Sequence, residues 1–175
     1  MTQAFNGGNN NSFSFREAPL KLWQNIAIGS LGFWLSGSLV LDLVIMPTLW
    51  ATGMMESSGF ASASYSIFWI FNRVELLCAA AALSSIWALS TVARPNVDSQ
   101  RKLLVGAVML MAIALSYTFV ITPQMSSLGL DLDVFATAKL PAEMNQMHSI
   151  YWVLEASKIG IAGMLLSLCN SQLGD

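Results

Sequence analysis

Four long apolar segments dominate the sequence, at residues 26–46, 65–92, 103–122 and 148–168. An α-helix rises about 1.5 Å per residue, so about 20 apolar residues are enough to cross the hydrocarbon core of a bilayer. Isolated strands would leave backbone groups unpaired, because lipid offers no hydrogen-bond partner. The segments therefore predict an all-α fold, an integral membrane four-helix bundle.

The overall composition agrees with a membrane-embedded chain. Hydrophobic residues make up 55% of it and charged residues only 10%, whereas soluble domains carry about 25% charged residues. The mean hydropathy is +0.59. The formal net charge of -2 comes with no basic stripe, which excludes a nucleic-acid partner and leaves membrane lipid as the expected surroundings.

The chain divides into one membrane domain and two short tails. Residues 1–19 are rich in Asn, Gly and Ser and are expected to be a disordered polar tail, because they have too little apolar area to fold alone. Residues 20–169 form the four-helix transmembrane domain, and residues 170–175 form a short C-terminal tail. Cys78 and Cys169 both lie in apolar segments, where thiols are usually inert packing residues.

The basic residues predict the orientation. Five of them flank one side of the membrane and only Lys139 falls in the other two loops; the five are Arg16, Lys21, Arg94, Arg101 and Lys102. Loops rich in Lys and Arg stay in the cytoplasm. Both termini are therefore predicted on the cytoplasmic side, or on its equivalent in an internal membrane. The loops 47–64 and 123–147 would face outward.

An internal repeat runs through the chain. VIMP at 44–47 matches VITP at 120–123, and YSIFW at 65–69 matches HSIYW at 148–152. The prolines are 76 residues apart (47 to 123) and the aromatic motifs 83 (65 to 148). This spacing predicts two parallel-repeated helical hairpins, with Pro47 and Pro123 as helix-exit prolines. Parallel repeats occur in transporters, but they also arise when a small bundle is built by plain duplication.

Five charged residues lie inside the apolar segments: Asp42, Arg73, Glu75, Glu155 and Lys158. A charge at the bilayer centre costs roughly 2.5–3.5 kcal/mol on insertion scales, so we expect these residues to form a polar intramembrane cluster. Glu155 and Lys158 are three apart and share a helix face. Arg73 points away from Glu75, and therefore has to reach another helix or extend along its own helix toward the surface.

The cluster contains three acids and two bases, and this surplus leaves two interpretations open. One is an ion-pair lattice that fixes how the helices pack. The other is an outward-open polar cavity, in which the carboxyl without a cation takes up a proton or a metal cation.

Further candidate ligands lie at the start of the last segment. Met144, Met147 and His148 occur in the stretch EMNQMH, and thioethers with imidazole are ligands that Cu(I) prefers. Methionine is equally an adaptable packing residue. With a single His in the chain, bis-histidine haem within one chain is excluded, and we expect no cofactor. Nucleotide-binding, zinc-hydrolase and serine-hydrolase motifs are absent from the sequence, so we do not expect an enzyme.

Small residues mark one face of the first apolar segment. Gly29, Gly32 and Ser36 form a small-xxx-small pattern that lets helices approach closely. The pattern suits contact within the bundle, self-association, or packing against another membrane protein.

Several of these motifs resemble those of a known family. The proline-ended helices (VIMP, VITP) and a fourth helix that opens MHSIYWVLE look like the transmembrane-protein-205-like four-helix membrane proteins. The chain is also similar to membrane proteins of copper-resistance operons. The first resemblance covers roughly residues 22–168 and carries over Pro47, Pro123, His148 and Ser149. The Asn-rich tail and the charges Arg73, Glu75 and Lys158 depart from the family pattern.

The sequence leaves two candidate functions. The resemblance implies a four-helix membrane protein without an established chemistry. Short connections and small-residue faces favour a structural or accessory membrane component. The alternative is a small transporter or a cation-binding protein, with copper as one candidate cation, that uses the polar cavity.

Overall fold

The structure, a computed structural model, describes residues 11–54, 57, 59–92, 96–135 and 142–171. Within these ranges the regular elements are all helical. They are α1 (Asn11–Val40), η1 (Leu41–Ile45), α2 (Met46–Ala51), α3 (Phe60–Val92), α4 (Val97–Ser116), η3 (Tyr117–Ile121), α5 (Thr122–Phe135) and α6 (Ala142–Ser171). The elements η1 and η3 are single π-helical turns.

These elements join into four rods that are long and apolar enough to cross a membrane: Ala18–Ala51, Phe60–Val92, Val97–Leu128 and Asn145–Ser171. The all-helical fold and the four candidate spans fit a multi-pass integral membrane protein, as the sequence predicted. Helix α1 begins at Asn11, so it includes part of the segment that we expected to be a disordered tail. Residues 1–10 and 172–175 lie outside the described residues.

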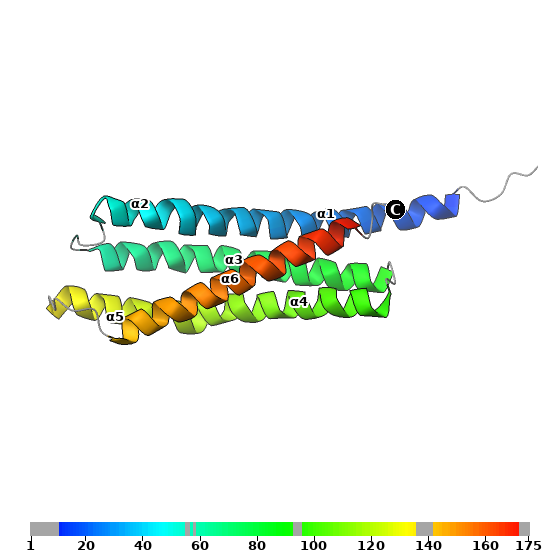
Figure 1. Cartoon of the computed structure of the whole chain (residues 1–175). Coiled ribbons are helices and arrows are strands. Elements are labelled where there is room, and N and C mark those ends of the chain that lie inside the picture. The colour runs from blue at the N-terminus through cyan, green and yellow to red at the C-terminus, as the bar shows by residue number, and fades with distance from the viewer. Residues whose placement is uncertain (1–10, 55–56, 58, 93–95, 136–141, 172–175) are drawn as a thin grey trace, which may run out of the picture.

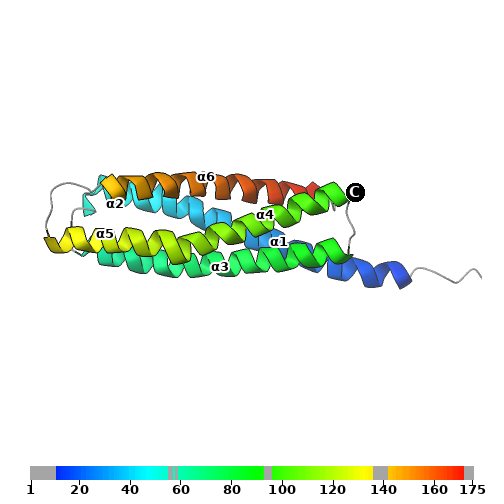
Figure 2. The same ribbon diagram turned by 90° about the horizontal axis from the view of Figure 1, so that it is seen from below.

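The four rods pack as a ring around one core. Helix α1 contacts α3 and α6, and α4 contacts the same two helices, so that α3 and α6 lie diagonally opposite (Figures 1 and 2). Helices α2 and α5 lie at one end of the bundle, and the last turn of α3 and the first turn of α4 lie at the other (Figure 1). We call these the proline end, after Pro47 and Pro123, and the basic end, after Arg101 and Lys102.

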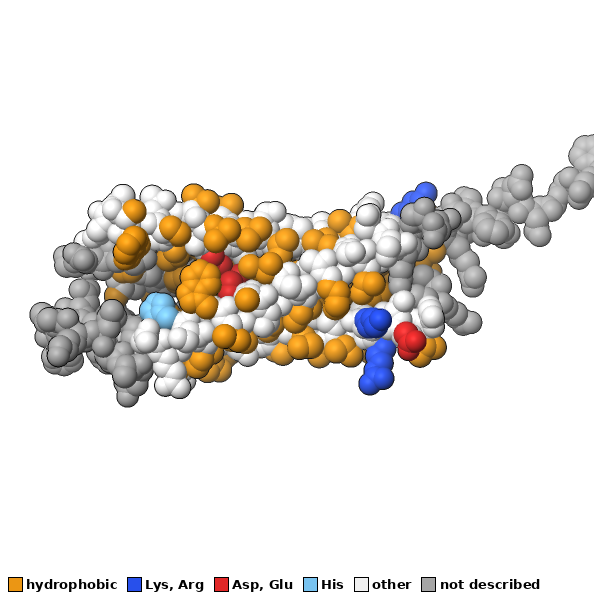
Figure 3. Space-filling view, viewed as in Figure 1, with side chains coloured by type: hydrophobic (Ala, Val, Ile, Leu, Met, Phe, Trp, Pro, Cys, Tyr) orange, Lys and Arg blue, Asp and Glu red, His pale blue; other side chains and the backbone are white. Residues whose placement is uncertain are grey.

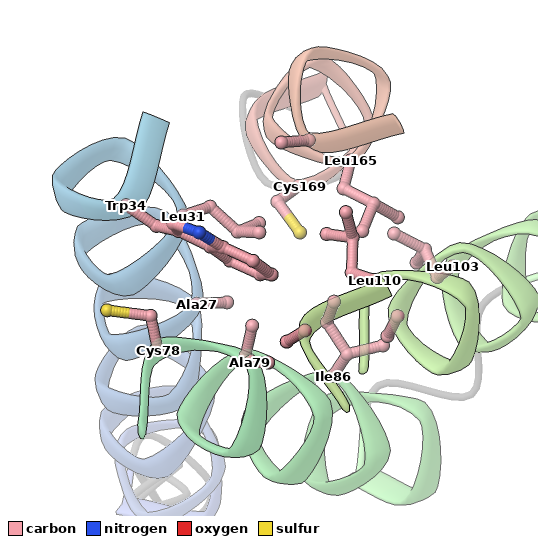
Figure 4. Packing of buried hydrophobic residues seen from close by; sticks show 14 of the residues in the cluster. Ala27, Leu31, Trp34, Cys78, Ala79, Ile86, Leu103, Leu110, Leu165 and Cys169 are labelled. Carbon is pink, nitrogen blue, oxygen red and sulfur yellow. The ribbon is translucent and has the colours of Figure 1, made fainter. Parts of the chain in front are cut away.

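The core toward the basic end is apolar and closely packed. Side chains from α1, α3, α4 and α6 converge there, among them Leu31, Ile86, Leu110 and Leu165, each fully buried (Figure 4). Gly106 allows α4 and α6 to come close, since a Cβ at this position would lie 2.9 Å from Leu165 Cδ2. Both cysteines are free thiols buried in this part of the bundle.

The outer surface is apolar, as lipid contact requires. Large side chains such as Leu77, Trp87 and Phe119 are 71%, 64% and 70% exposed, and apolar side chains cover much of the visible face (Figure 3). In water such a surface would mark an interaction site. In a bilayer it is the ordinary lipid-facing side of a membrane bundle.

Pro47 and Pro123 do not end their helices, which corrects the prediction of helix-exit prolines. Each helix continues beyond its proline, as α2 to Ala51 and as α5 to Phe135. Proline has no N–H to donate and its ring crowds the preceding turn. The helix adapts with a π turn just upstream: Met46 N–H bonds to the Leu41 carbonyl and Thr122 N–H to the Tyr117 carbonyl.

The first rod ends later, at a residue with a different property. Gly53 follows α2 with a φ of +70°, a left-handed conformation that only glycine adopts without strain. The turn to α3 therefore begins at Gly53 and not at Pro47.

Candidate functional site

Four ionisable side chains meet inside the bundle, toward the proline end. They are Asp42 from η1, Glu75 from α3, and Glu155 and Lys158 from α6, with exposed fractions of 5%, 1%, 1% and 3%. We call these four residues the buried ionic cluster. Burial of this degree is rare for charged side chains unless they are paired.

Lys158 lies at the centre of the cluster. Its Nζ is 2.6 Å from Glu75 Oε1 and 2.7 Å from Glu155 Oε2. The contact with Glu155 follows from the helical spacing of three residues. The contact with Glu75 joins the diagonal helices α3 and α6 across the middle of the bundle, which the sequence alone did not specify.

Glu75 receives further hydrogen bonds from α1. Trp34 Nε1 donates to Glu75 Oε1 at 2.8 Å, and Ser38 Oγ donates to the same oxygen at 3.4 Å. Trp34, Ser38 and Asp42 are four apart along the chain, so they line one face of the first rod. Glu75 Oε1 therefore accepts from three side chains, two on α1 and one on α6.

Two tyrosines complete the other side of the cluster. The Tyr117 hydroxyl lies 3.1 Å from Glu155 Oε2 and 3.2 Å from the Tyr151 carbonyl oxygen. The Tyr151 hydroxyl donates to Asp42 Oδ1 at 2.6 Å. Their rings contact each other with centroids 5.4 Å apart, and Lys158 Nζ lies 5.3 Å from the centroid of the Tyr117 ring, a distance at which cation–π attraction acts.

Two carboxyl oxygens in the cluster are left without a donor. Asp42 Oδ2 and Glu155 Oε1 are buried and have no hydrogen-bond partner among the described residues. The two carboxyl groups are linked through the two tyrosines, because Tyr151 donates to Asp42 and Tyr117 contacts both Glu155 and the Tyr151 carbonyl oxygen. A buried carboxyl oxygen without a donor costs free energy unless a proton or another cation reaches it.

Both π turns supply residues to the cluster. Asp42 lies in η1 and Tyr117 in η3, and both are buried. A π turn inserts an extra residue into the helical ladder and changes which side chains face inward, and such turns are frequent at functional sites. The prolines that produce these turns therefore help to position the cluster.

The structure places Arg73 apart from the other four predicted residues. Its side chain is exposed on the outside of the bundle, and its guanidinium lies 3.8 Å above the centroid of the Trp69 ring. In the described part of the chain it forms no ion pair with a carboxylate. Arg73 was expected either to reach another helix or to extend along its own helix toward the surface. The structure shows the second, because the side chain extends along α3 toward Trp69 and the proline end.

The predicted metal ligands lie near the start of α6. Met147 is half-buried and His148 is exposed, while the side chain of Met144 lies outside the described residues. Across the residues that the structure describes, no group of three or more His, Cys, Asp and Glu side chains could hold a metal ion. The geometry therefore adds no support to a metal site beyond the types of residue present.

The predicted small-residue pattern of α1, Gly29, Gly32 and Ser36, does not pack inside the bundle. A Cβ added to Gly29 or Gly32 would meet nothing within 4 Å, and Ser36 is exposed and bonds to the Gly32 carbonyl of its own helix. The close approach within the bundle instead uses Gly106, on a different helix.

Sequence reasoning missed three residues of the site: Trp34, Ser38 as a ligand of Glu75, and Tyr117. Two signals were present. Trp34 shares a face with Ser38 and Asp42, and Tyr117 is the lone tyrosine of an otherwise apolar helix.

Comparison with known proteins found no match to any family model, to any curated protein or to any solved structure. Function therefore has to be inferred from the cluster itself.

Proposed function

We propose that this membrane protein binds a proton inside the bilayer, between Asp42 and Glu155, and that it belongs to the class of small proton- or cation-handling transporters. The observation that carries the proposal is the pair of buried carboxyl oxygens, Asp42 Oδ2 and Glu155 Oε1, which have no donor among the described residues. The carboxyl groups that own them are linked through the hydroxyl groups of Tyr151 and Tyr117.

The charge balance supports the same proposal. The buried ionic cluster has three carboxyl groups and one ammonium group, so it would carry two net negative charges if every group were ionised. An unpaired charge in a low-dielectric interior is costly, and a buried carboxyl without a cation takes up a proton instead. One proton placed on Asp42 Oδ2 would donate to Glu155 Oε1 and satisfy both oxygens.

The surrounding residues suit a site that changes its protonation state. Glu155 contacts Lys158 with one oxygen, while its other oxygen is buried and has no donor among the described residues. Loss of the proton would leave Lys158 as the main partner of Glu155, whereas gain of the proton would join Glu155 to Asp42. Asp42 lies on a π turn, where the backbone ladder is already displaced from regular α-helical bonding.

Access to the site is narrow. Asp42 is 5% exposed, more than the other three residues of the cluster. The space-filling view shows a small patch of acidic side-chain atoms between apolar side chains, on the same half of the molecule as His148, which is pale blue (Figure 3). A proton can reach such a site through a few water molecules, while a larger solute requires the bundle to open.

The first test is infrared spectroscopy of the purified protein in lipid. A protonated carboxyl has a C=O stretch that an ionised carboxylate lacks, and we expect this band in the wild type. The variant Asp42→Asn should lose the band, because Glu155 then remains ionised beside Lys158. The matched control is Asp98→Asn, the same change at an exposed carboxyl of α4, which should leave the band intact. A wild-type spectrum without the band would refute the proposal.

The second test measures transport. Proteoliposomes containing a pH-sensitive dye should show proton flux with the wild type and with Asp98→Asn, and little flux with Asp42→Asn. A protonated carboxyl without flux, and without any exchange of the proton, would indicate that the proton is a fixed part of the fold.

An accessory role is the second candidate, and it rests on a different observation. Gly29 on α1 and Gly160 and Gly163 on α6 are exposed, and a Cβ at any of them would meet nothing within 4 Å. Small residues on the lipid-facing side allow another transmembrane helix to approach closely. A stoichiometric membrane protein that purifies with the wild type in mild detergent, but not with Gly29→Ile or Gly160→Ile, would favour this role. Self-association through Gly29, Gly32 and Ser36 would instead appear as a dimer.

We make two finer proposals. We propose that both termini are cytoplasmic, which the basic end supports. We also propose that the chain is a duplicated hairpin, which the matches of VIMP with VITP and of YSIFW with HSIYW support. The π turns at 41–45 and 117–121 lie at the same spacing of 76 as Pro47 and Pro123. Glu75 and Lys158 follow the spacing of 83 (75 to 158).

Copper binding through Met144, Met147 and His148 is a weaker proposal, because only the residue types support it. Elemental analysis of protein purified without added metal tests it. About one copper per chain, lost in His148→Ala and Met147→Ala, would favour it.

A further inference from the structure

Arg73 is a charged side chain on the lipid-facing surface, and the buried ionic cluster does not use it. Its guanidinium stacks on Trp69, and no carboxylate in the described part of the chain pairs with it. Stacking on an aromatic ring leaves the N–H groups at the edge of the guanidinium available for an acceptor. Because an unpaired charge is costly in this position, an anion from outside the bundle would stabilise the Arg73 guanidinium.

The aromatic residues of α3 place this guanidinium at a definite depth. Trp69 and Trp87 are both exposed, at 45% and 64%, and tryptophans gather at the two membrane–water interfaces. Their separation of 18 positions (69 to 87) corresponds to about 27 Å, close to the thickness of the hydrocarbon core. Arg73 lies one turn inside Trp69, and its stacked guanidinium therefore reaches the interface at the proline end, where lipid phosphates lie.

A small open cavity lies beside this guanidinium. Its volume is about 140 Å³. Its wall is mostly apolar, with a smaller polar share; the lining residues are Tyr65, Trp69, Asn72, Arg73, Thr118, Phe119, Thr122 and Pro123. Asn72 Nδ2 donates to Thr122 Oγ1 at 2.7 Å, which joins α3 to α5 and holds the polar side of the cavity in place.

We propose that Arg73 and this cavity bind the phosphate of an anionic phospholipid headgroup. A guanidinium forms strong, two-pronged hydrogen bonds with phosphate oxygens. Thr122 lines the same cavity and its hydroxyl suits the polar part of the headgroup, while the Thr118 hydroxyl already donates to the Ala114 carbonyl at 2.9 Å. An anionic headgroup neutralises Arg73, whereas a choline headgroup brings a cation of its own. The site is independent of the proton site, because Arg73 lies outside the buried ionic cluster.

The test is native mass spectrometry of the whole chain with phosphatidylglycerol or phosphatidylcholine. We expect the wild type to retain one phosphatidylglycerol molecule more tightly than phosphatidylcholine. Arg73→Gln should weaken this retention roughly tenfold to hundredfold, the effect of losing a charged hydrogen bond. Arg73→Lys, which keeps the charge but not the planar fork, should fall between the two. The matched control is Arg101→Gln, an exposed arginine of α4 at the basic end, which should retain the lipid as the wild type does.

Three results would overturn the proposal. The first is equal retention of phosphatidylglycerol by wild type and Arg73→Gln. The second is an equal loss in Arg101→Gln, which would mean that overall charge attracts the lipid. The third is displacement of the lipid by inorganic phosphate at millimolar concentration, which would identify a soluble anion as the ligand. If Arg73→Gln does not fold, Arg73→Lys alone decides, since a specific site requires it to bind more weakly than the wild type.

Discussion

Replacing Lys158 with Met removes the cation that holds the buried ionic cluster together. In the wild type its Nζ contacts Glu75 Oε1 at 2.6 Å and Glu155 Oε2 at 2.7 Å, and both carboxyl groups are 1–2% exposed as side chains. Without the ammonium group, both would be buried without a counter-charge. Breaking a buried ion pair by removing one partner costs about 3–5 kcal/mol.

This loss is large enough to measure in detergent or in lipid. For a chain of this size a change of 1 kcal/mol moves the melting temperature by about 2–4 °C, so Lys158→Met should melt roughly 6–20 °C below the wild type. Lys102→Met is the matched control, because Lys102 is exposed at the basic end. We expect its melting temperature to stay near that of the wild type.

A triple variant separates the loss of the cation from the loss of packing. Lys158→Met combined with Glu75→Gln and Glu155→Gln removes all three charges. The Trp34 N–H and the Tyr117 hydroxyl can still donate to the new amide oxygens. Replacing a whole buried ion pair is often nearly neutral, so the triple variant should regain most of the lost stability. If it is no more stable than Lys158→Met alone, uncompensated charge is not the cause and the reasoning fails.

Three further predictions concern packing, the π turn and topology. Gly106→Val should destabilise the fold by about 1–3 kcal/mol through overpacking, because a Cβ at this position would lie 2.9 Å from Leu165 Cδ2. The control Gly160→Val, where a Cβ would meet nothing within 4 Å, should melt near the wild type. Equal losses of stability in the two variants would contradict the packing argument. Pro47→Ala restores a backbone N–H, so η1 can return to α-helical bonding. We expect this variant to fold and to show a shifted infrared C=O band of the protonated carboxyl. An unchanged band would mean that the π turn does not position the carboxyl groups. An impermeant maleimide applied to intact cells should label Ser57→Cys and not Asn96→Cys, both exposed positions, and the reverse pattern would invert the proposed orientation.

The extent of the fold was readable in the sequence because lipid imposes a strict rule on the backbone. Apolar segments of 20 residues or more must be helices, and the four spans lie where the hydropathy placed them. The prolines were misread, because a proline is expected to end a helix. The π turns at Leu41–Ile45 and Tyr117–Ile121, through which the helices continue, were seen only in the structure.

The candidate site was readable only in part. Glu155 and Lys158 are three residues apart on one helix, so their pairing follows from local geometry alone. The contacts of Glu75 with Lys158 and of Tyr151 with Asp42 join residues 83 and 109 positions apart. Such contacts depend on which helices are neighbours and on how each is rotated, and neither follows from hydropathy.

By itself, the sequence determined that the chain has four segments long and apolar enough to cross a membrane as helices, and that charged residues occur inside them. The segments must be helical because exposing unpaired backbone groups to lipid is costly. The charged residues inside them must be paired or neutralised because exposing charge to lipid is also costly. Tertiary structure alone decided which charges meet. The rotation of α3 turns Glu75 inward to Lys158 and, because Arg73 is two residues away, leaves Arg73 outside against Trp69. The cluster is therefore left with three carboxyl groups and one cation, and with two buried carboxyl oxygens that have no donor among the described residues.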